Sequence, residues 1–352
     1  FGSSVAFLLK ILWRGPVWCS KPIAYFAMAK RSAEREPRNV EVDWGKAEFQ
    51  HVRTRLDGRI LVIELNRPKQ RNAWTEIMRN EIIEIVDTAN RDPQVRVMIF
   101  TGNPEGGAFC AGMDLNGMPG GNYMPGDMAP GRQGQVQFGR DGGGQASLAI
   151  VRSLKPCIAA INGPAVGIGA TLTTPMDFRI AAEDAKMGFV FGKRGLTMEG
   201  TSSFFLPRLV GLTKANDFVL TARIFTAKEE ENCGLFTRVV PKDQVLPEAM
   251  KIARSLLDVS PMSTMLNRHL IQRGYADDAT PESAHLNESR MMGATWMNPD
   301  APEGIKSFLE KRAPDWKTDP WKDTPFFFPW WKEQSVIPNQ PRYNRFPARP
   351  KL

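Results

Sequence analysis

The chain has 352 residues, of which 42% are hydrophobic and 24% charged, and these shares are ordinary for a soluble globular protein. The formal net charge of +8 comes mainly from the two ends of the chain. The body between them is close to neutral, which argues against a nucleic-acid-binding protein. Four dispersed cysteines without a C-x-x-C pair and three scattered histidines indicate neither a disulfide framework nor a metal site.

The first 33 residues contain no acidic side chain and mix basic residues with aliphatic and aromatic ones. This composition is typical of a mitochondrial transit peptide and predicts a location in the mitochondrial matrix. If this basic N-terminal segment is not cleaved, we expect it to dock the protein onto a partner. No membrane span is expected, because Lys10 and Arg14 interrupt an apolar run that is already too short.

The body begins with two predicted strands, 49–56 and 60–65, which flank Asp57-Gly58 and so form a hairpin. Apolar residues at helical spacing between 77 and 86 predict a helix, and a buried strand follows at 95–101. This alternation is that of a β-β-α superhelix. Residues 117–144 are rich in Gly, Met and Pro, so we expect either a lid beside the site or a disordered insertion.

The central stretch, 156–208, contains the most informative pattern. An apolar strand at 157–161 and an Asn-Gly turn lead to a glycine-rich bend at 167–169, which opens an apolar helix. Glycines let a backbone N–H approach a ligand, and a helix N-terminus adds partial positive charge, so the bend suits a developing oxyanion. A purely structural turn is the alternative. The dinucleotide-binding fingerprint fails, because Leu172 occupies its third glycine position.

Two helices and a strand are predicted after the central stretch. The first helix covers 213–220, the second begins at Thr226-Ala227-Lys228-Glu229, and the strand covers 237–240. Apolar residues between 252 and 296 predict further helices.

Residues 159–211 contain, in order, the motifs AAINGPAVGIG, DFRIA, KMGF and SFFLPRLVG. These resemble the crotonase (enoyl-CoA hydratase/isomerase) superfamily, and the resemblance extends from about 49 to about 316. It implies an α/β fold, a crotonase-like β-β-α superhelix with a C-terminal helical trimerisation part. The chain would then divide into a basic N-terminal extension (1–45), a crotonase core (46–258), a C-terminal helical region (259–315) and a Pro/aromatic-rich docking tail (316–352).

The resemblance also implies site residues. In the segment GAFCAGMDL, the backbone N–H of Met113 would form one half of an oxyanion hole, and that of Ile168 the other. A turn that packs Phe109 and Leu115 is the structural alternative. Coenzyme A would enter as part of the substrate, with no covalently bound cofactor. Its contacts would be Ala73, Ala111, Phe308 and Lys311, although for Lys311 a solvated helix charge is an equal alternative.

Hydratases of this family use two glutamates, whose positions fall on Thr171 and Phe191. Neither side chain can exchange a proton near neutral pH. Glu199 lies where relatives that isomerise or dehalogenate acyl-CoAs place their carboxylate. A double-bond shift needs only one base. Apolar neighbours such as Phe189, Phe191 and Phe204 would raise the pKa of Glu199. We therefore predict an enoyl-CoA double-bond isomerase with Glu199 as catalytic residue; a solvent-facing Glu at a helix N-terminus is the alternative.

The tail interleaves aromatic residues with prolines, which preclude a long helix. Because aromatic residues anchor interfaces, it is predicted to lie on another protein, with folding over its own domain or a trimer neighbour as the alternative. The missing hydratase glutamates, the basic N-terminal segment and this tail favour a rival hypothesis, a catalytically inactive structural subunit of a large mitochondrial complex. The expected partners are an acyl-CoA, a homo- or heterotrimer of crotonase folds, and a larger assembly reached through the two extensions.

Overall fold

The computed structural model describes residues 40–115, 141–274 and 280–331. These residues fall into two units, one formed by 40–324 with Trp331 and the other by Pro325–Trp330. In the small unit the amide of Phe328 donates to the carbonyl oxygen of Pro325 at 2.9 Å. All described helices and strands belong to the larger unit.

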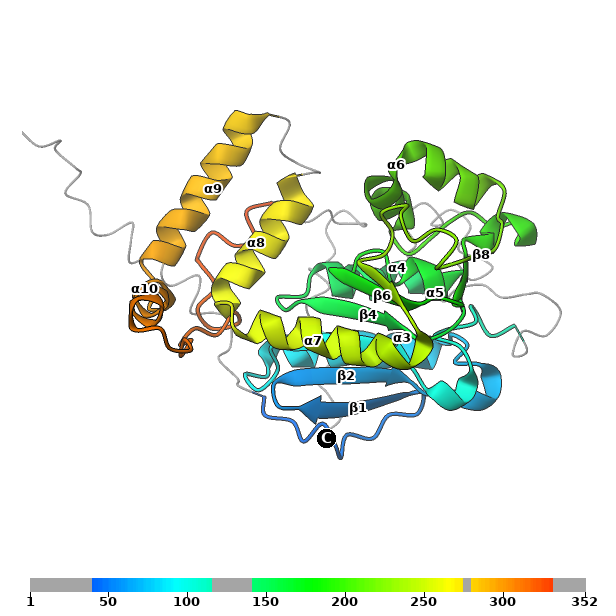
Figure 1. Cartoon of the computed structure of the whole chain (residues 1–352), viewed down its shortest axis with the longest axis horizontal. Helices are drawn as coiled ribbons and strands as arrows, with labels where there is room; N and C mark the ends of the chain where they lie inside the picture. Colours follow the sequence, from blue (N-terminus) through cyan, green and yellow to red (C-terminus); the bar gives the residue numbers. More distant parts are fainter. Residues whose placement is uncertain (1–39, 116–140, 275–279, 332–352) are drawn as a thin grey trace, which may run out of the picture. The chain divides into compact units, whose positions relative to one another are not determined.

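The larger unit is built on a six-stranded sheet (Figure 1). Its strands, in spatial order, are β1 (Val52–Asp57), β2 (Ile60–Leu65), β3 (Val97–Gly102), β4 (Cys157–Ile161), β6 (Phe178–Ala182) and β9 (Arg238–Val240). β1 and β2 form the predicted hairpin, in which Gly58 has a φ of +59°, and all later pairs are parallel. A smaller sheet contains β5 (Ala165–Val166), β7 (Lys186–Gly188) and β8 (Phe225–Thr226).

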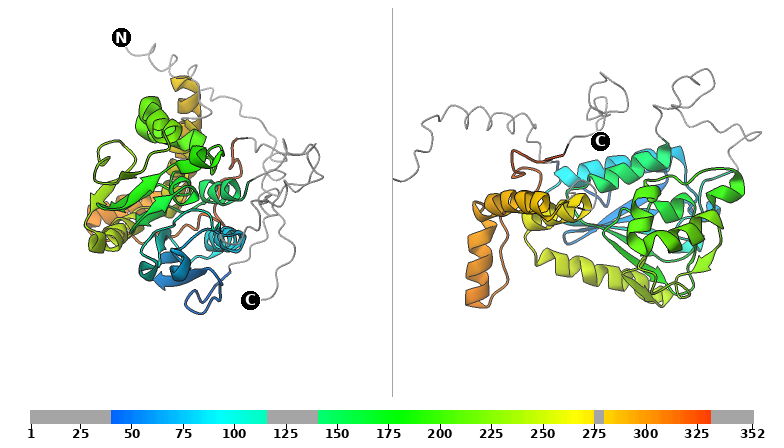
Figure 2. Two further views of the ribbon diagram at one scale, coloured as in Figure 1. Left: turned by 90° about the vertical axis from the view of Figure 1, so that its right-hand side faces the viewer. Right: turned by 90° about the horizontal axis from the view of Figure 1, so that it is seen from above.

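Helices cover both faces of the large sheet, so every residue of β3 and β4 is buried. α3 (Glu76–Arg91) and α4 (Gly142–Val151) pack together on one face, and α7 (Val245–Leu257) lies on the other (Figure 2). α3 confirms the predicted amphipathic helix. Its first turn is capped by Thr75, whose side-chain oxygen accepts the Met78 amide, and its apolar stripe faces the core.

Two elements of the central region differ from the prediction. The helix opened by the glycine bend, α5 (Ile168–Thr171), has only four residues. The side chains of Thr173 and Thr174 bond back to the carbonyls of Ala170 and Thr171, which favours turns over a continued helix. No helix forms after Thr226, because the amides of 227 and 228 donate to the carbonyls of 185 and 183 instead.

The predicted long loop ends earlier than expected. Residues 116–140 lie outside the described part of the chain, but Gly142, Gly143 and Gly144 already belong to α4. Asp141 caps this helix, since its Oδ1 accepts the amide of Gly144 at 2.6 Å. The prediction of a loop through residue 144 was therefore wrong at its C-terminal end.

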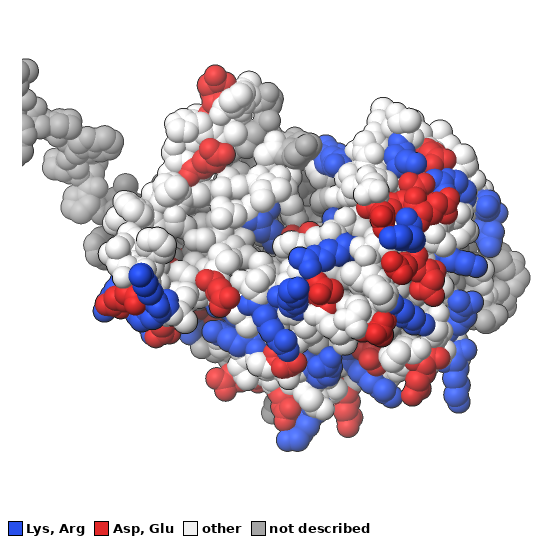
Figure 3. Space-filling view, in the orientation of Figure 1, with Lys and Arg blue, Asp and Glu red and all other residues white. Residues whose placement is uncertain are grey.

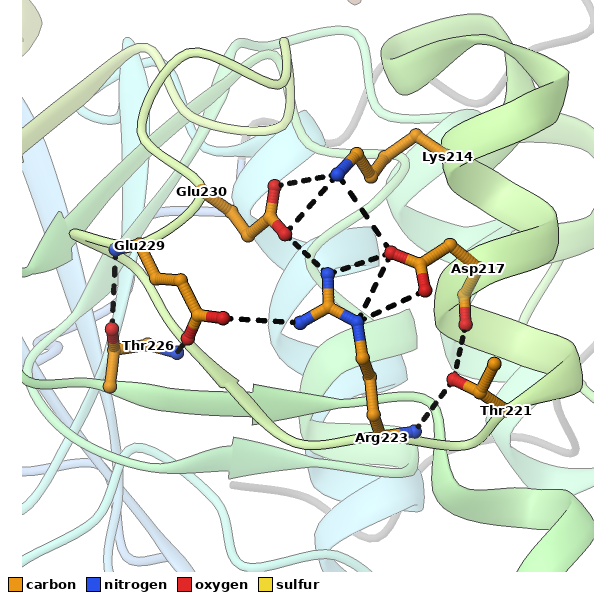
Figure 4. Close-up of polar contacts among 7 residues, drawn as sticks. All are labelled: Lys214, Asp217, Thr221, Arg223, Thr226, Glu229 and Glu230. Carbon is orange, nitrogen blue, oxygen red and sulfur yellow. Dashed lines mark hydrogen bonds and ion pairs between the residues drawn. The ribbon is translucent and has the colours of Figure 1, made fainter.

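α6 (Ser202–Leu220) includes the helix predicted at 213–220 and begins eleven residues earlier, with a break at Gly211, whose φ is +76°. A network of charged side chains joins α6 to β8 (Figure 4). Arg223 donates to Asp217 Oδ2 at 2.7 Å and contacts Glu230, and Lys214 Nζ lies 3.1 Å from Glu230 Oε2. Because β8 pairs with β7 and β7 with β5, this network braces the strands that lead into the glycine bend.

The C-terminal part is helical, as predicted, and contains α8 (Pro261–Gly274), α9 (Pro281–Trp296) and α10 (Asp300–Glu310). Within the larger unit, residues 316–324 of the tail and Trp331 contact the C-terminal helices. The amides of Lys317 and Thr318 donate to Asp300, and Trp331 lies against His269. This matches the alternative of packing on the same domain, whereas residues 332–352 lie outside the described part and their docking stays a prediction. No helix in the described ranges is long and apolar enough to cross a membrane.

Arg268 is the polar anchor of α8. Its side chain is 4% exposed, and its Nε donates to Asp177 Oδ1 at 2.8 Å. Its remaining nitrogens donate to the backbone carbonyls of Ile150, Val151 and Ser153. The residue thus connects α8 to the end of α4 and to the turn before β6.

Replacing Arg268 by Met is expected to destabilise the protein by about 3–5 kcal/mol, because the partly buried Asp177 carboxylate and three backbone carbonyls lose the Arg268 guanidinium as a donor. Chemical denaturation of both proteins measures this difference. Lys306→Ala is the control, since its side chain is 66% exposed and its pairing with Glu310 is worth at most about 0.5 kcal/mol. An Arg268→Met loss as small as that of the control would contradict the anchoring role.

Candidate active site

Two backbone segments that are distant in sequence lie side by side at the glycine bend. Cys110 forms a parallel bridge with Ala165, and its carbonyl accepts the Val166 amide at 3.1 Å. Gly169 packs directly on Cys110, because a Cβ on Gly169 would lie 2.3 Å from the Cys110 carbonyl oxygen. Only glycine permits this approach. The predicted oxyanion-hole segments are therefore neighbours.

The amides of Met113 and Ile168 have their hydrogens available. Trp74 donates to the Gly112 carbonyl and accepts the Asp114 amide, and in such a parallel bridge the N–H of the intervening Met113 points away from Trp74. Ile168 is the first residue of α5, so its N–H has no acceptor within the helix. Within the described ranges neither amide donates to a protein acceptor. Their role as an oxyanion hole stays a prediction.

Glu199 turns toward α5 rather than toward solvent. Its Oε1 accepts the Thr171 hydroxyl at 2.6 Å. Its Oε2 is buried and lacks a hydrogen-bond partner among the residues that the structure describes. This oxygen lies against α4, because a Cβ on Gly143 would be 1.8 Å from it. The arrangement argues against the alternative of a solvent-facing glutamate.

The electrostatic environment holds the proton on Glu199. Burial of the carboxyl raises its pKa to about 8, and the Thr171 hydrogen bond opposes this rise. The nearby Asp141 carboxylate adds to it, because it repels the ionised form of Glu199 and hydrogen-bonds the neutral form. The predicted direction was thus right. Two of the aromatic residues named for it have other contacts: Phe189 stacks on Phe218, and Phe204 meets Phe205 edge-on.

Sequence reasoning missed Asp141 and Gly143. Both fell inside the predicted long loop, yet a signal was present: an Asp directly before a run of glycine and apolar residues is a helix N-cap pattern. Thr171 was recognised only as a missing glutamate, not as a hydrogen-bond donor.

The remaining predicted site residues are more dispersed. Phe191 is half-buried, with Cζ 4.0 Å from a Cβ built on Gly167. Ala111 lies beside Met113, and Ala73 is buried next to Trp74. The structure does not bring α10 to Glu199. α10 lies at the opposite end of the larger unit from α5 (Figures 1 and 2). Phe308 is on this helix and is 82% exposed, and Lys311 directly follows the helix end.

The family model described as enoyl-CoA hydratase/isomerase matches residues 55–319 of the chain. The chain belongs to this family. It is therefore a crotonase-family acyl-CoA enzyme, and such enzymes act on coenzyme A thioesters without a bound cofactor. The arrangement of sheet and C-terminal helices described above is the crotonase fold.

Similar proteins support this assignment. Over 263 residues the chain is 40% identical to enoyl-CoA hydratase ACTT3 of Alternaria alternata, covering 72% of this chain and 82% of that protein. It is 33% identical over 265 residues to enoyl-CoA hydratase EchA19 of Mycobacterium tuberculosis, and the match covers 74% of this chain and 94% of that protein. A solved structure, a probable enoyl-CoA hydratase/isomerase from Mycobacterium abscessus, matches with a TM-score of 0.68 and 26% identity, covering 76% of this chain and 98% of that one.

Proposed function

We propose that this crotonase-family enzyme is an enoyl-CoA isomerase, which moves a double bond from C3–C4 to C2–C3 of an acyl thioester. The observation that carries the proposal is the buried Glu199 carboxyl, whose Oε1 accepts the Thr171 hydroxyl of α5. Its Oε2 lies against Gly143 of α4 and accepts no hydrogen bond from a described residue. The two positions at which hydratases place glutamates hold Thr171 and Phe191, which cannot transfer protons. A single positioned carboxyl is what a 1,3-proton shift requires.

The reaction conserves all atoms of the substrate. Ionised Glu199 takes a proton from C2, and the electron pair of the broken C–H bond moves into the thioester, which becomes a dienolate. The amides of Met113 and Ile168 would stabilise its oxyanion by several kcal/mol. Glu199 then returns the proton to C4, the electron pair closes the C2–C3 double bond, and the carboxylate is regenerated.

Hydration of a 2-enoyl-CoA is the second candidate. The relatives reported above are named enoyl-CoA hydratases, and Asp141 provides a second carboxyl near Glu199. Hydration needs one group that activates water and one that delivers a proton to carbon. We place it second because Asp141 Oδ1 is already engaged by the amide of Gly144.

Ultraviolet absorbance distinguishes these candidates, because only the 2-enoyl isomer has a double bond conjugated with the thioester. Purified full-length protein is mixed with a 3-enoyl-CoA in one cuvette and a 2-enoyl-CoA in another. Isomerase activity raises the absorbance of the first, whereas hydratase activity lowers that of the second. A protein that does neither would support the rival hypothesis of a structural subunit.

The raised pKa of Glu199 makes the isomerase rate depend on pH. The base must be ionised before it can take a proton, and burial raises the pKa of this group to about 8. We therefore expect kcat/KM to rise with pH about tenfold per unit below pH 8 and to level off above it. Stopped-flow assays between pH 6 and 10 measure the profile. A flat profile across this range would contradict the assignment of Glu199 as base.

We also propose that the protein assembles into a trimer through its C-terminal helices. α8 and α9 expose large apolar side chains, including Ile271, Leu286, Met292 and Trp296, each at least 65% exposed. The surface over these helices carries few charges (Figure 3). Because α10 is remote from Glu199 of the same chain, its proposed coenzyme A contacts would serve the site of another copy. The mitochondrial location and docking through the two extensions stay predictions.

A further inference from the structure

Thr171 is held in one orientation by its surroundings. The residue is fully buried on α5 and donates to Glu199 Oε1 at 2.6 Å, while the carbonyl of Ile168 is a more distant acceptor at 3.4 Å. Gly200 leaves space for the side chain: it has a φ of +66°, and a Cβ there would lie 2.8 Å from Thr171 Oγ1. The loop before α6 therefore confines the hydroxyl beside the carboxyl.

The two oxygens of Glu199 are consequently not equivalent. Oε1 accepts the Thr171 hydroxyl, whereas Oε2 faces Gly143 and accepts no hydrogen bond from a described residue. The Asp141 carboxylate lies within hydrogen-bonding reach of the Glu199 carboxyl and can accept only when Glu199 carries its proton. In a neutral carboxyl the carbonyl oxygen is the better acceptor, so donation by Thr171 to Oε1 favours the proton on Oε2.

We propose that Thr171 is a positioning residue that restricts proton transfer to the Oε2 oxygen of Glu199. The inference rests on the proposed isomerase reaction and assigns its two proton transfers to a single atom. The Oε2 lone pair takes the proton from C2, and the same O–H delivers it to C4. Thr171 keeps its hydroxyl proton throughout, because its donation to Oε1 suits both the ionised and the neutral carboxyl.

The same hydrogen bond influences the acidity of Glu199. Donation stabilises the carboxylate, so Thr171 lowers the pKa of Glu199 against the opposing effect of burial. The titratable groups that face Glu199 are Asp141, at the start of α4, and the buried thiol of Cys110. A substitution at position 171 alters neither, so a change in titration would report on the hydroxyl itself.

Two substitutions test the role of the hydroxyl in the full-length protein. Thr171→Val removes it at similar volume, and Thr171→Ser retains it. We expect the valine variant to lose about 10- to 100-fold in kcat with little change in KM, and its pH–rate profile to shift to higher pH. The serine variant should keep kcat within about threefold and the original profile. A valine variant with wild-type kcat and profile overturns the inference.

A second measurement separates this inference from the proposed function. Infrared difference spectra, with Glu199→Gln as reference, follow the titration of Glu199 in the absence of substrate. Wild-type and Thr171→Val proteins should titrate at different pH, and identical titration overturns the inference. If the titration differs but wild-type protein does not isomerise a 3-enoyl-CoA, the proposed function fails instead.

Discussion

Glu199→Gln is expected to reduce isomerase turnover by about 10³-fold or more. The amide has nearly the shape of the carboxyl and can still accept the Thr171 hydroxyl, but it cannot take a proton from carbon. Binding of the thioester should persist, because the backbone amides of Met113 and Ile168 are unchanged. The loss should therefore appear in kcat, measured by the absorbance assay, with KM little altered.

Stability provides an independent readout of the same substitution. A carboxyl whose pKa is higher in the folded protein binds more protons there than in the unfolded chain, so wild-type stability falls as pH rises from about 4.5 to about 8. The Glu199→Gln variant has no carboxyl that must ionise at this position, so its stability should not fall in this way. Above pH 8 it should therefore be more stable than the wild type. Glu84→Gln, a change on α3, serves as control for both measurements. Unchanged turnover in Glu199→Gln would refute the proposed mechanism.

Gly143→Ala is expected to reduce kcat by about 10²-fold without unfolding the protein. The added methyl would lie 1.8 Å from Glu199 Oε2 and 2.7 Å from Ile168 Cδ1, so the carboxyl must move away from its present place. Alanine is also a better helix former than glycine by about 1 kcal/mol, which offsets part of the steric cost. Thermal unfolding should accordingly change little while the absorbance assay shows the loss.

Gly142→Ala is the matched control for this prediction. It makes the same change one residue earlier in the first turn of α4. Among the described residues, the atoms nearest to the new methyl belong to the flexible side chain of Arg79, with Cδ 3.1 Å away. Its kcat should stay near that of the wild type. Equal losses in the two variants would mean that α4 as a whole, rather than contact with Glu199, accounts for the effect.

Local patterns in the sequence predicted much of the scaffold. The hairpin at Asp57-Gly58, the amphipathic helix α3 and the buried strands β3 and β4 follow from short-range turn chemistry and apolar periodicity. The motifs also placed Met113, Ile168 and Glu199, because the order of such segments along the chain is preserved when the same fold forms.

Other features depended on contacts that a local pattern does not contain. The helix predicted after Thr226 is absent because tertiary hydrogen bonds engage the amides of that segment, and α5 is short because its threonines bond back to the backbone. The positions of Phe308 and Lys311, remote from Glu199 within one chain, likewise follow from where α10 packs.

The motifs and their order thus predicted the family and the strand and helix segments that lead into the site, and they singled out Glu199 as the candidate base. The surroundings of Glu199, by contrast, depend on contacts between segments that are distant in the sequence. Asp141 and Gly143, at the start of α4, and Thr171 of α5 meet Glu199 in the loop before α6, and burial there raises its pKa to about 8. Acidity and proton position depend on distances between side chains that are far apart in the chain, and folding alone sets those distances.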